Sequence, residues 1–362
     1  MQKIYWLLAL VPITLGIRYL TSWNGTLVFL LSAGAMIPLA KLLSDATEQL
    51  SFKTGPTLGA LLNVTFGNAG ELVIGFFALR AGLQRLVKAS ITGSILVNLL
   101  LTLGISMLAG GLRKKTLKFN PLAARTQTTM LALAAISLIL PAGYSLLGGR
   151  AARSGMGDLS LEFSVVLVVI YGLSLVFTLH THQQFLAPPK RDEVEPSASA
   201  WSTARALGVL ILSAVFVAWM GEVLVGSIEA ASKSLGMTDL FVGLVVVAIA
   251  GNAAESTAAV RASLKNRMDL SVGIAAGSSI QVALFVAPVL VFLSKWIGPG
   301  PMDLVFTPVE IMAIVLAVVV TAQIASDGDS NWLEGAQLIA VYVMLAVMFF
   351  YLPEPAGSNV SP

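Results

Sequence analysis

The chain has 362 residues, of which 56% are hydrophobic and only 11% are charged. A soluble domain carries about 25% charged residues, so this composition indicates a membrane protein with many spans. The formal charge of +3 argues against a nucleic-acid partner, and the lack of cysteine excludes disulfides and thiolate metal sites. Long continuous apolar runs, rather than short alternating segments, favour spanning helices over a β-barrel.

The apolar runs predict an all-α polytopic fold with about eleven transmembrane helices. The first run reads as a retained span, because no small-residue cleavage motif follows it. A polar stretch at 186–203, with prolines and the acids Asp192, Glu193 and Glu195, predicts a linker near the middle of the chain. The expected spans are 4–20, 26–44, 57–79, 88–110, 126–147, 160–180, 205–228, 240–262, 271–296, 305–325 and 333–351.

A pentapeptide occurs twice, as Gly67-Asn68-Ala69-Gly70-Glu71 and as Gly251-Asn252-Ala253-Ala254-Glu255. The two copies are 184 positions apart, and the same offset relates Met36 to Met220, Asp45 to Glu229, and Gly93-Ser94 to Gly277-Ser278. We therefore expect an extra N-terminal helix at 1–24, a first five-helix repeat at 25–185, and a second at 204–362. Because five is odd, the second repeat must enter the membrane from the opposite side, which is the plan of many secondary transporters.

Lys and Arg residues set the expected orientation, since they are enriched in cytoplasmic loops. Most of them fall on the side that carries the N-terminus and the 186–203 linker, and the cluster Arg113-Lys114-Lys115 dominates the difference. The N-terminus and the linker are therefore expected in the cytoplasm and the C-terminus outside. The predicted location is a cell (inner) membrane.

In both pentapeptides the Asn and the Glu stand three positions apart, which places them on one helical face. A carboxylate at membrane depth costs about 2.5–3.5 kcal/mol, so Glu71 and Glu255 indicate a function. Because the copies run in opposite directions, the two carboxylates should flank the bilayer centre. Gly67 and Gly251 would let a neighbouring backbone approach closely or a carbonyl be presented. The alternative is that these small and polar residues only pack helices together.

Two carboxylates with amide and carbonyl oxygens make a hard, all-oxygen site. Such a site suits Ca²⁺, which takes six to eight oxygen ligands. Carboxylates that are buried close together also bind protons more readily. The protonated pair would tolerate an empty site, whereas the ionised pair would need a cation, so one shared site suffices for exchange.

Other polar groups are expected around this site. Ser94, Asn98, Ser278 and Gln281 could complete the coordination shell, together with Asn68 and Asn252, or else serve only as hydrogen bonds between helices. Four acids near the predicted second and seventh spans could attract cations along an access path, with ordinary charges at helix ends as the alternative: Asp45, Glu48, Glu222 and Glu229. Met36 and Met220 are expected to fill the core rather than occlude the path.

His180 and His182 end the sixth span two positions apart, which places them on different helical faces. A joint metal site is therefore not expected, and a surface helix end is favoured over a role in pH sensing.

The chain resembles the cation/proton exchangers (CAX) of the calcium/cation antiporter superfamily. The resemblance is carried by both Gly-Asn-Ala-x-Glu copies and by the strings at 45–48, 61–63, 88–98, 181–182, 277–281 and 327–335. It implies calcium efflux coupled to proton uptake, with Glu71 and Glu255 as the shared binding groups. Sodium/calcium exchangers of the same superfamily carry Gly-Thr-Ser-type motifs, so Asn68 and Asn252 favour proton coupling. The family's acidic cytoplasmic segment is represented here by only three acids, so strong calcium regulation through the linker is not expected.

The sequence thus predicts a Ca²⁺/H⁺ antiporter that works by alternating access. A sodium-coupled calcium exchanger and a passive cation channel are the alternatives. An enzyme is not expected, because neither a His-Glu-x-x-His motif nor a pair of intramembrane aspartates is evident. No resident cofactor is expected; the partners would be Ca²⁺, other divalent cations and the lipid bilayer, and a homo-oligomer is compatible with the sequence.

Overall fold

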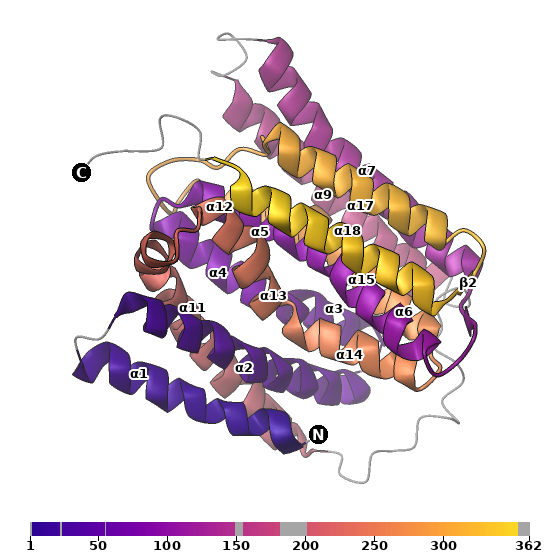
Figure 1. The fold of residues 1–362 in the computed structure, drawn as a ribbon, viewed down its shortest axis with the longest axis horizontal. Helices are drawn as coiled ribbons and strands as arrows, with labels where there is room; N and C mark the ends of the chain where they lie inside the picture. Colours follow the sequence, from indigo (N-terminus) through magenta and orange to yellow (C-terminus); the bar gives the residue numbers. More distant parts are fainter. Residues whose placement is uncertain (1, 22–23, 55, 149–154, 182–200, 354–362) are drawn as a thin grey trace.

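The structure is a computed structural model that describes residues 2–21, 24–54, 56–148, 155–181 and 201–353. These residues are almost entirely helical (Figure 1). The only strands among them are β1 (Leu117–Lys118) and β2 (Asp329–Ser330), which pair antiparallel. The predicted all-α class is therefore confirmed. Residues 182–200 of the linker region, with its three acids and His182, lie outside the described part.

The helices of the first half begin with η1 (Gln2–Ala9), α1 (Leu10–Leu20) and α2 (Gly25–Thr54). They continue with α3 (Pro56–Gly67), α4 (Ala69–Arg80), α5 (Gln84–Leu96), η2 (Val97–Thr102), α6 (Leu103–Gly111), α7 (Pro121–Leu147), α9 (Met156–Val176) and η3 (Phe177–Thr181). The second half contains α11 (Thr203–Leu235), α12 (Asp239–Phe241), η5 (Val242–Val247), α13 (Ala248–Gly251), α14 (Ala253–Leu264), α15 (Met268–Gln281), η6 (Val282–Val286), α16 (Ala287–Leu293), α17 (Pro308–Ile324) and α18 (Trp332–Tyr351).

Each of the eleven expected spans corresponds to one helix or to a run of consecutive helices. Seven helices in the described part are long and apolar enough to cross a membrane alone, or eight when the bent pair Asp239–Gly251 and Ala253–Leu264 is taken as one span. The helices at Ile4–Leu20 and Pro308–Ile324 are shorter. The count of eleven crossings therefore stays a prediction.

Two of the expected continuous helices are broken, and each break falls at the Asn of a pentapeptide. Asn68 separates α3 from α4 with φ −107° and ψ 28°. Asn252 separates α13 from α14 with φ −91° and ψ 11°, and the two helices are bent by 56°. Asn competes with the helical backbone through its own amide, and the preceding Gly favours a helix end. The expected spans 57–79 and 240–262 are therefore each made of consecutive helices that meet at the Asn.

The helices that carry the shell residues lie at the centre of the molecule. The most apolar part of the helix from Gln84 to Gly111 is 83% buried, against 22% for that from Met156 to Thr181. Figure 1 shows α5, α13 and α15 in the middle, with α1 and α2 on one side and α7 and α17 on the other. Helices of the two halves interleave, since α2 packs along α11 and α5 along η5.

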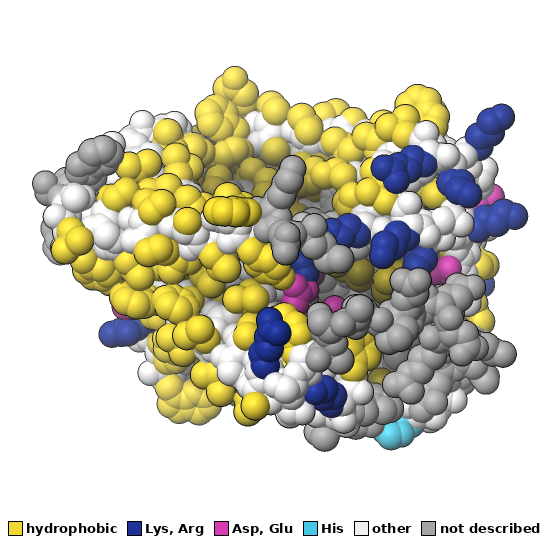
Figure 2. Space-filling view, turned by 90° about the horizontal axis from the view of Figure 1, so that it is seen from below, with side chains coloured by type: hydrophobic (Ala, Val, Ile, Leu, Met, Phe, Trp, Pro, Cys, Tyr) yellow, Lys and Arg dark blue, Asp and Glu magenta, His cyan; other side chains and the backbone are white. Residues whose placement is uncertain are grey.

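The outer surface fits a lipid environment. Large apolar side chains are exposed on α7, α9, α11 and α18, among them Leu140, Val166, Leu212 and Met344. Figure 2 shows a broad hydrophobic surface on which most of the Lys and Arg side chains gather toward one end. An apolar outer surface of this kind is typical of a protein that spans a lipid bilayer.

Candidate cation-binding site

The two pentapeptides lie against each other in the core. Glu71 lies in the first turn of α4 and Glu255 in the first turn of α14. A Cβ atom placed on Gly251 would lie 3.3 Å from Glu71 Oε1, and one placed on Gly70 would lie 3.8 Å from the Gly251 carbonyl oxygen. The absence of side chains at these glycines therefore lets the backbone of one copy approach the carboxylate of the other.

The motif asparagines bind the shell helices of the opposite half. Asn252 donates through Nδ2 to Ser94 Oγ at 2.9 Å, and Ser278 Oγ donates to Asn68 Oδ1 at 3.5 Å. Ser94 and Ser278 are related by the same offset as the asparagines, so the two contacts form one reciprocal pair. The same two residue types meet in both contacts, with Asn252 as the donor in one and Asn68 as the acceptor in the other.

Further amide contacts close the network. Asn98 Nδ2 donates to Asn252 Oδ1 at 2.7 Å and to Ser278 Oγ at 3.0 Å. Asn68 Nδ2 donates to Gln281 Oε1 at 2.5 Å. The structure thus brings six of the predicted residues into one hydrogen-bonded cluster: Asn68, Ser94, Asn98, Asn252, Ser278 and Gln281.

Three oxygen atoms, one of this cluster and two of the motif glutamates, are buried and accept no hydrogen bond: Asn98 Oδ1, Glu71 Oε1 and Glu255 Oε2. Glu71 is only 7% exposed and Asn98 is fully buried. Leaving a buried polar atom unpaired costs about 1–3 kcal/mol, so such atoms mark a place for a ligand or a proton. All three are oxygens, which is the donor type that hard cations prefer.

The protein offers few charged ligands to a cation at this site. In the described part of the chain, no group of three or more His, Cys, Asp or Glu side chains could hold a metal ion together. The ligands would therefore be the two carboxylates with amide, hydroxyl and backbone oxygens. A site of this kind can change its charge by protonation of only two groups.

One polar pair at the site was missed from the sequence. Thr102 Oγ1 and Ser256 Oγ lie 2.5 Å apart, next to Glu255 and one turn beyond Asn98. Both could have been found from the sequence, because Ser256 directly follows Glu255 and Thr102 stands four positions after Asn98. The shell helices also contain π-helical turns, η2 and η6, at nearly equivalent places in the two halves. Turns of this type are frequent at functional sites, but sequence periodicity does not reveal them.

The access-path acids do not join the amide cluster. Asp45 accepts hydrogen bonds from Tyr5 of the N-terminal helix and from Lys41. Glu229 is exposed and forms an ion pair with Lys233 at 2.6 Å. Glu48 and Glu222 are exposed as well. Their role in attracting cations stays a prediction.

The remaining predicted residues lie either in the hydrophobic core or on the surface. Met36 and Met220 are fully buried, and Met36 Cε lies 3.9 Å from a Cβ placed on Gly70. This burial agrees with their expected role in the core. His180 is exposed at the end of η3.

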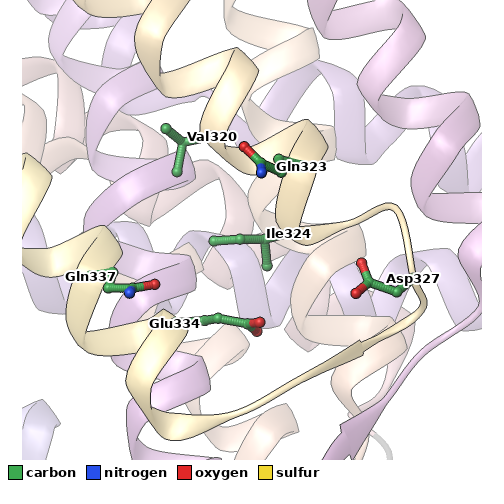
Figure 3. A pocket seen from close by; sticks show the side chains of 6 residues that line it. All are labelled: Val320, Gln323, Ile324, Asp327, Glu334 and Gln337. Atoms are coloured by element: carbon green, nitrogen blue, oxygen red, sulfur yellow. The ribbon is translucent and has the colours of Figure 1, made fainter.

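A separate cavity of about 310 Å³ lies between the end of α17 and the start of α18 (Figure 3). Its lining includes Gln323, Asp327, Glu334 and Gln337, but no residue of the pentapeptides. Glu334 closes a capping box with Asn331, accepting its backbone N–H at 3.2 Å. Much of the 327–335 string thus builds the start of α18 and the β1–β2 pair.

The chain matches known proteins over nearly its full length. The family model described as sodium/calcium exchanger protein matches twice, at residues 24–180 and 205–351. A Ca(2+)/H(+) antiporter of Aphanothece halophytica is 41% identical over 96% of both chains. The Ca(2+)/H(+) antiporter ChaA of Bacillus subtilis is also 41% identical, over 97% of this chain and all of its own.

The solved structure of native YfkE is similar in fold. Its TM-score is 0.84 at 38% sequence identity, and the match covers 96% of this chain and 100% of YfkE. Sequence identity of this level over whole chains and the two matches to the family model together assign the chain to a family. The chain belongs to the sodium/calcium exchanger family of membrane transporters, within its cation/proton exchanger branch.

Proposed function

We propose that this protein exchanges cytoplasmic Ca²⁺ for external H⁺, with Glu71 and Glu255 as the shared binding groups. The observation that carries the proposal is the set of three buried, unpaired oxygens on Glu71, Glu255 and Asn98. They come from both halves of the chain: Glu71 and Glu255 follow the two helix breaks, and Asn98 is hydrogen-bonded to Asn252 at the second break. The relatives named as Ca(2+)/H(+) antiporters support the same choice of ions.

The exchange follows from the charge of the site. With Ca²⁺ bound, both carboxylates are ionised and their unpaired oxygens become ligands. Without Ca²⁺, protons neutralise the carboxylates, because two buried like charges repel each other in a low dielectric. The site therefore returns loaded with protons, and cation and proton movements are coupled.

Access to the site would alternate between the two sides of the membrane. Inverted repeats around a midplane site permit this, because one bundle rocks against the other around a fixed ligand cluster. The reciprocal Asn–Ser contacts support such a relation between the halves. In the proposed orientation, the N-terminus and the 186–203 linker are cytoplasmic.

Reconstituted protein tests the proposed ions. We expect Ca²⁺ added outside proteoliposomes to release internal protons, as read by a trapped pH dye, and this release should persist when Na⁺ is replaced by an impermeant cation. Uptake of Ca²⁺ that needs an opposing Na⁺ gradient would identify a sodium-coupled exchanger instead. Calcium flux without proton counterflow would identify a passive channel.

Replacing Asn252 by Leu tests whether the hydrogen-bonded polar residues around the two carboxylates are needed for Ca²⁺ binding. The change removes the acceptor of Asn98 and the donor to Ser94, so the buried amide and hydroxyl lose their partners. Two lost buried hydrogen bonds cost about 2–3 kcal/mol, so we expect the KM for Ca²⁺ to rise by at least about tenfold. Ser278→Ala, which removes weaker contacts, should have a smaller effect in the same flux assay. Equal KM values for Asn252→Leu and wild type would contradict a role in the shell.

A further inference from the structure

A second duplicated string follows the shell helices. Leu117-Lys118-Phe119-Asn120-Pro121 and Leu304-Val305-Phe306-Thr307-Pro308 lie 187 positions apart. The fourth residue of each string is a helix cap whose side chain accepts at least one backbone N–H, and the fifth is the Pro that begins α7 or α17. Alternate apolar residues are buried in both strings, with Leu117 and Leu304 fully buried and both phenylalanines at most 6% exposed. We name residues 117–120 the first wedge and 304–307 the second wedge.

Each wedge is attached to the shell helix of the other half. The backbone N–H of Asn120 in the first wedge donates to Asp269 Oδ1, at 2.5 Å, in the first turn of α15. The backbone oxygen of Val305 in the second wedge accepts from Lys88 Nζ, at 3.0 Å, on α5. Helix α15 carries Ser278, and α5 carries Ser94. Each wedge thus contacts the helix of the opposite half that carries a serine of the site, as the motif asparagines do.

The attachment at α5 alone combines an ion pair with a buried carboxylate. Lys88 also pairs with Asp303, just before the second wedge, and its side chain is 15% exposed. Glu310 on α17 is 2% exposed and accepts from Thr307 N at 2.9 Å, Thr307 Oγ1 at 2.8 Å and Thr92 Oγ1 at 3.3 Å. The corresponding residues around the first wedge carry no charge. At the offset of 184 they are Val272 for Lys88 and Ala276 for Thr92, and at the offset of 187 they are Thr116 for Asp303 and Ala123 for Glu310.

The contacts of Lys88 and Thr92 lie on the side of α5 that does not carry Ser94. Lys88 and Thr92 are one helical turn apart, whereas Ser94 is six residues beyond Lys88 and so points to a different side of the helix at about 100° per residue. One side of α5 is therefore attached to the second half through Lys88 and Thr92. The other side presents Ser94 to Asn252, and Asn98 follows in η2.

We propose that Lys88 and Glu310 are positioning residues, which fix α5 against the second wedge and α17 so that Ser94 and Asn98 face the cation site. They do not touch the cation. Their effect on exchange passes through the placement of α5, and it should therefore appear in the affinity for Ca²⁺ rather than in the turnover rate. The transport readout of this inference rests on the proposed function.

The test compares Lys88→Met with Lys88→Arg and with Lys118→Met. Lys118 is an exposed lysine of the first wedge, at the position of Val305, and serves as the matched control. In proteoliposomes we expect Lys88→Met to raise the KM for Ca²⁺ about tenfold, equivalent to 1.4 kcal/mol, with little change in kcat. Lys88→Arg, which keeps the charge and its donors, should restore the KM, and Lys118→Met should match wild type.

Two results would overturn the proposal: a Lys88→Met variant with wild-type KM, or a fall in kcat alone that Lys88→Arg does not restore. If Lys88→Met does not fold, Thr92→Val replaces it, because this change removes only the hydroxyl that binds Glu310; a raised KM then supports the proposal and an unchanged KM overturns it. If wild type itself shows no Ca²⁺/H⁺ exchange, the proposed function fails. Calorimetric Ca²⁺ binding to the same variants then decides the positioning role separately, with unchanged affinity refuting it.

Discussion

Glu71→Gln and Glu255→Gln should each reduce Ca²⁺-dependent proton flux to the background of empty liposomes. Glutamine keeps the size of the side chain and one oxygen, but it cannot ionise or carry the exchanged proton. Either change leaves one carboxylate to balance a divalent cation in a site whose other ligands are neutral. The measurement is the initial rate of proton release on Ca²⁺ addition, with each variant reconstituted at equal density.

The same substitution at Glu162 provides the control, because this glutamate lies exposed on α9. Glu162→Gln should keep the wild-type flux. Both site variants should also elute as folded protein in detergent, since neither change leaves a buried charge without its partner. Substantial residual exchange in either folded variant would rule out a site shared by the two carboxylates.

Gly93→Ala should strongly destabilise the protein. A Cβ atom at Gly93 would lie 2.2 Å from the Leu244 carbonyl oxygen and 2.7 Å from Ala248 Cβ, so α5 could no longer contact η5 and α13 as it does. Overpacking costs about 1–3 kcal/mol and more where backbone blocks the new atom, which exceeds the gain of about 1 kcal/mol from replacing Gly by Ala in a helix. We expect a clearly lower thermal unfolding midpoint in detergent and little active transporter.

The equivalent glycine of the second half offers a matched comparison. A Cβ atom at Gly277 meets no atom within 4 Å, so Gly277→Ala should leave the unfolding midpoint unchanged or raise it slightly. Equal midpoints for the Gly93 and Gly277 variants would show that the close crossing of α5 and η5 is not required for stability.

Sequence patterns were sufficient for the helical class and for the members of the central cluster. Apolar runs of membrane length indicate helices whatever their neighbours are, and the repeated pentapeptide pointed to residues that do meet in the core. The offset of 184 positions between the two halves was informative because equivalent residues of one chain could be compared directly. It also located Ser94 and Ser278, whose reciprocal contacts with Asn252 and Asn68 are now visible.

The breaks at Asn68 and Asn252 could not be predicted in the same way. Asn tolerates both helical and non-helical backbone, and the decision between them depends on groups from the other half that satisfy its amide. The sequence likewise gave no sign that Tyr5 of the added N-terminal helix bonds to Asp45, because that contact joins residues forty positions apart. Contacts of this kind depend on packing rather than on local pattern.

The broken helices have an electrostatic consequence. Each break sets the carbonyl end of one short helix, α3 or α13, beside the amide end of the next, α4 or α14. A helix end carries about half an elementary charge, negative at the carbonyl end and positive at the amide end. At the proposed site the carbonyl ends would contribute partial negative charge toward a cation, while Glu71 and Glu255 lie in the first turns at the amide ends. A straight spanning helix would place both of its ends at the membrane surfaces, so at the proposed site the breaks at the two asparagines would let the backbone carry part of the charge balance of exchange.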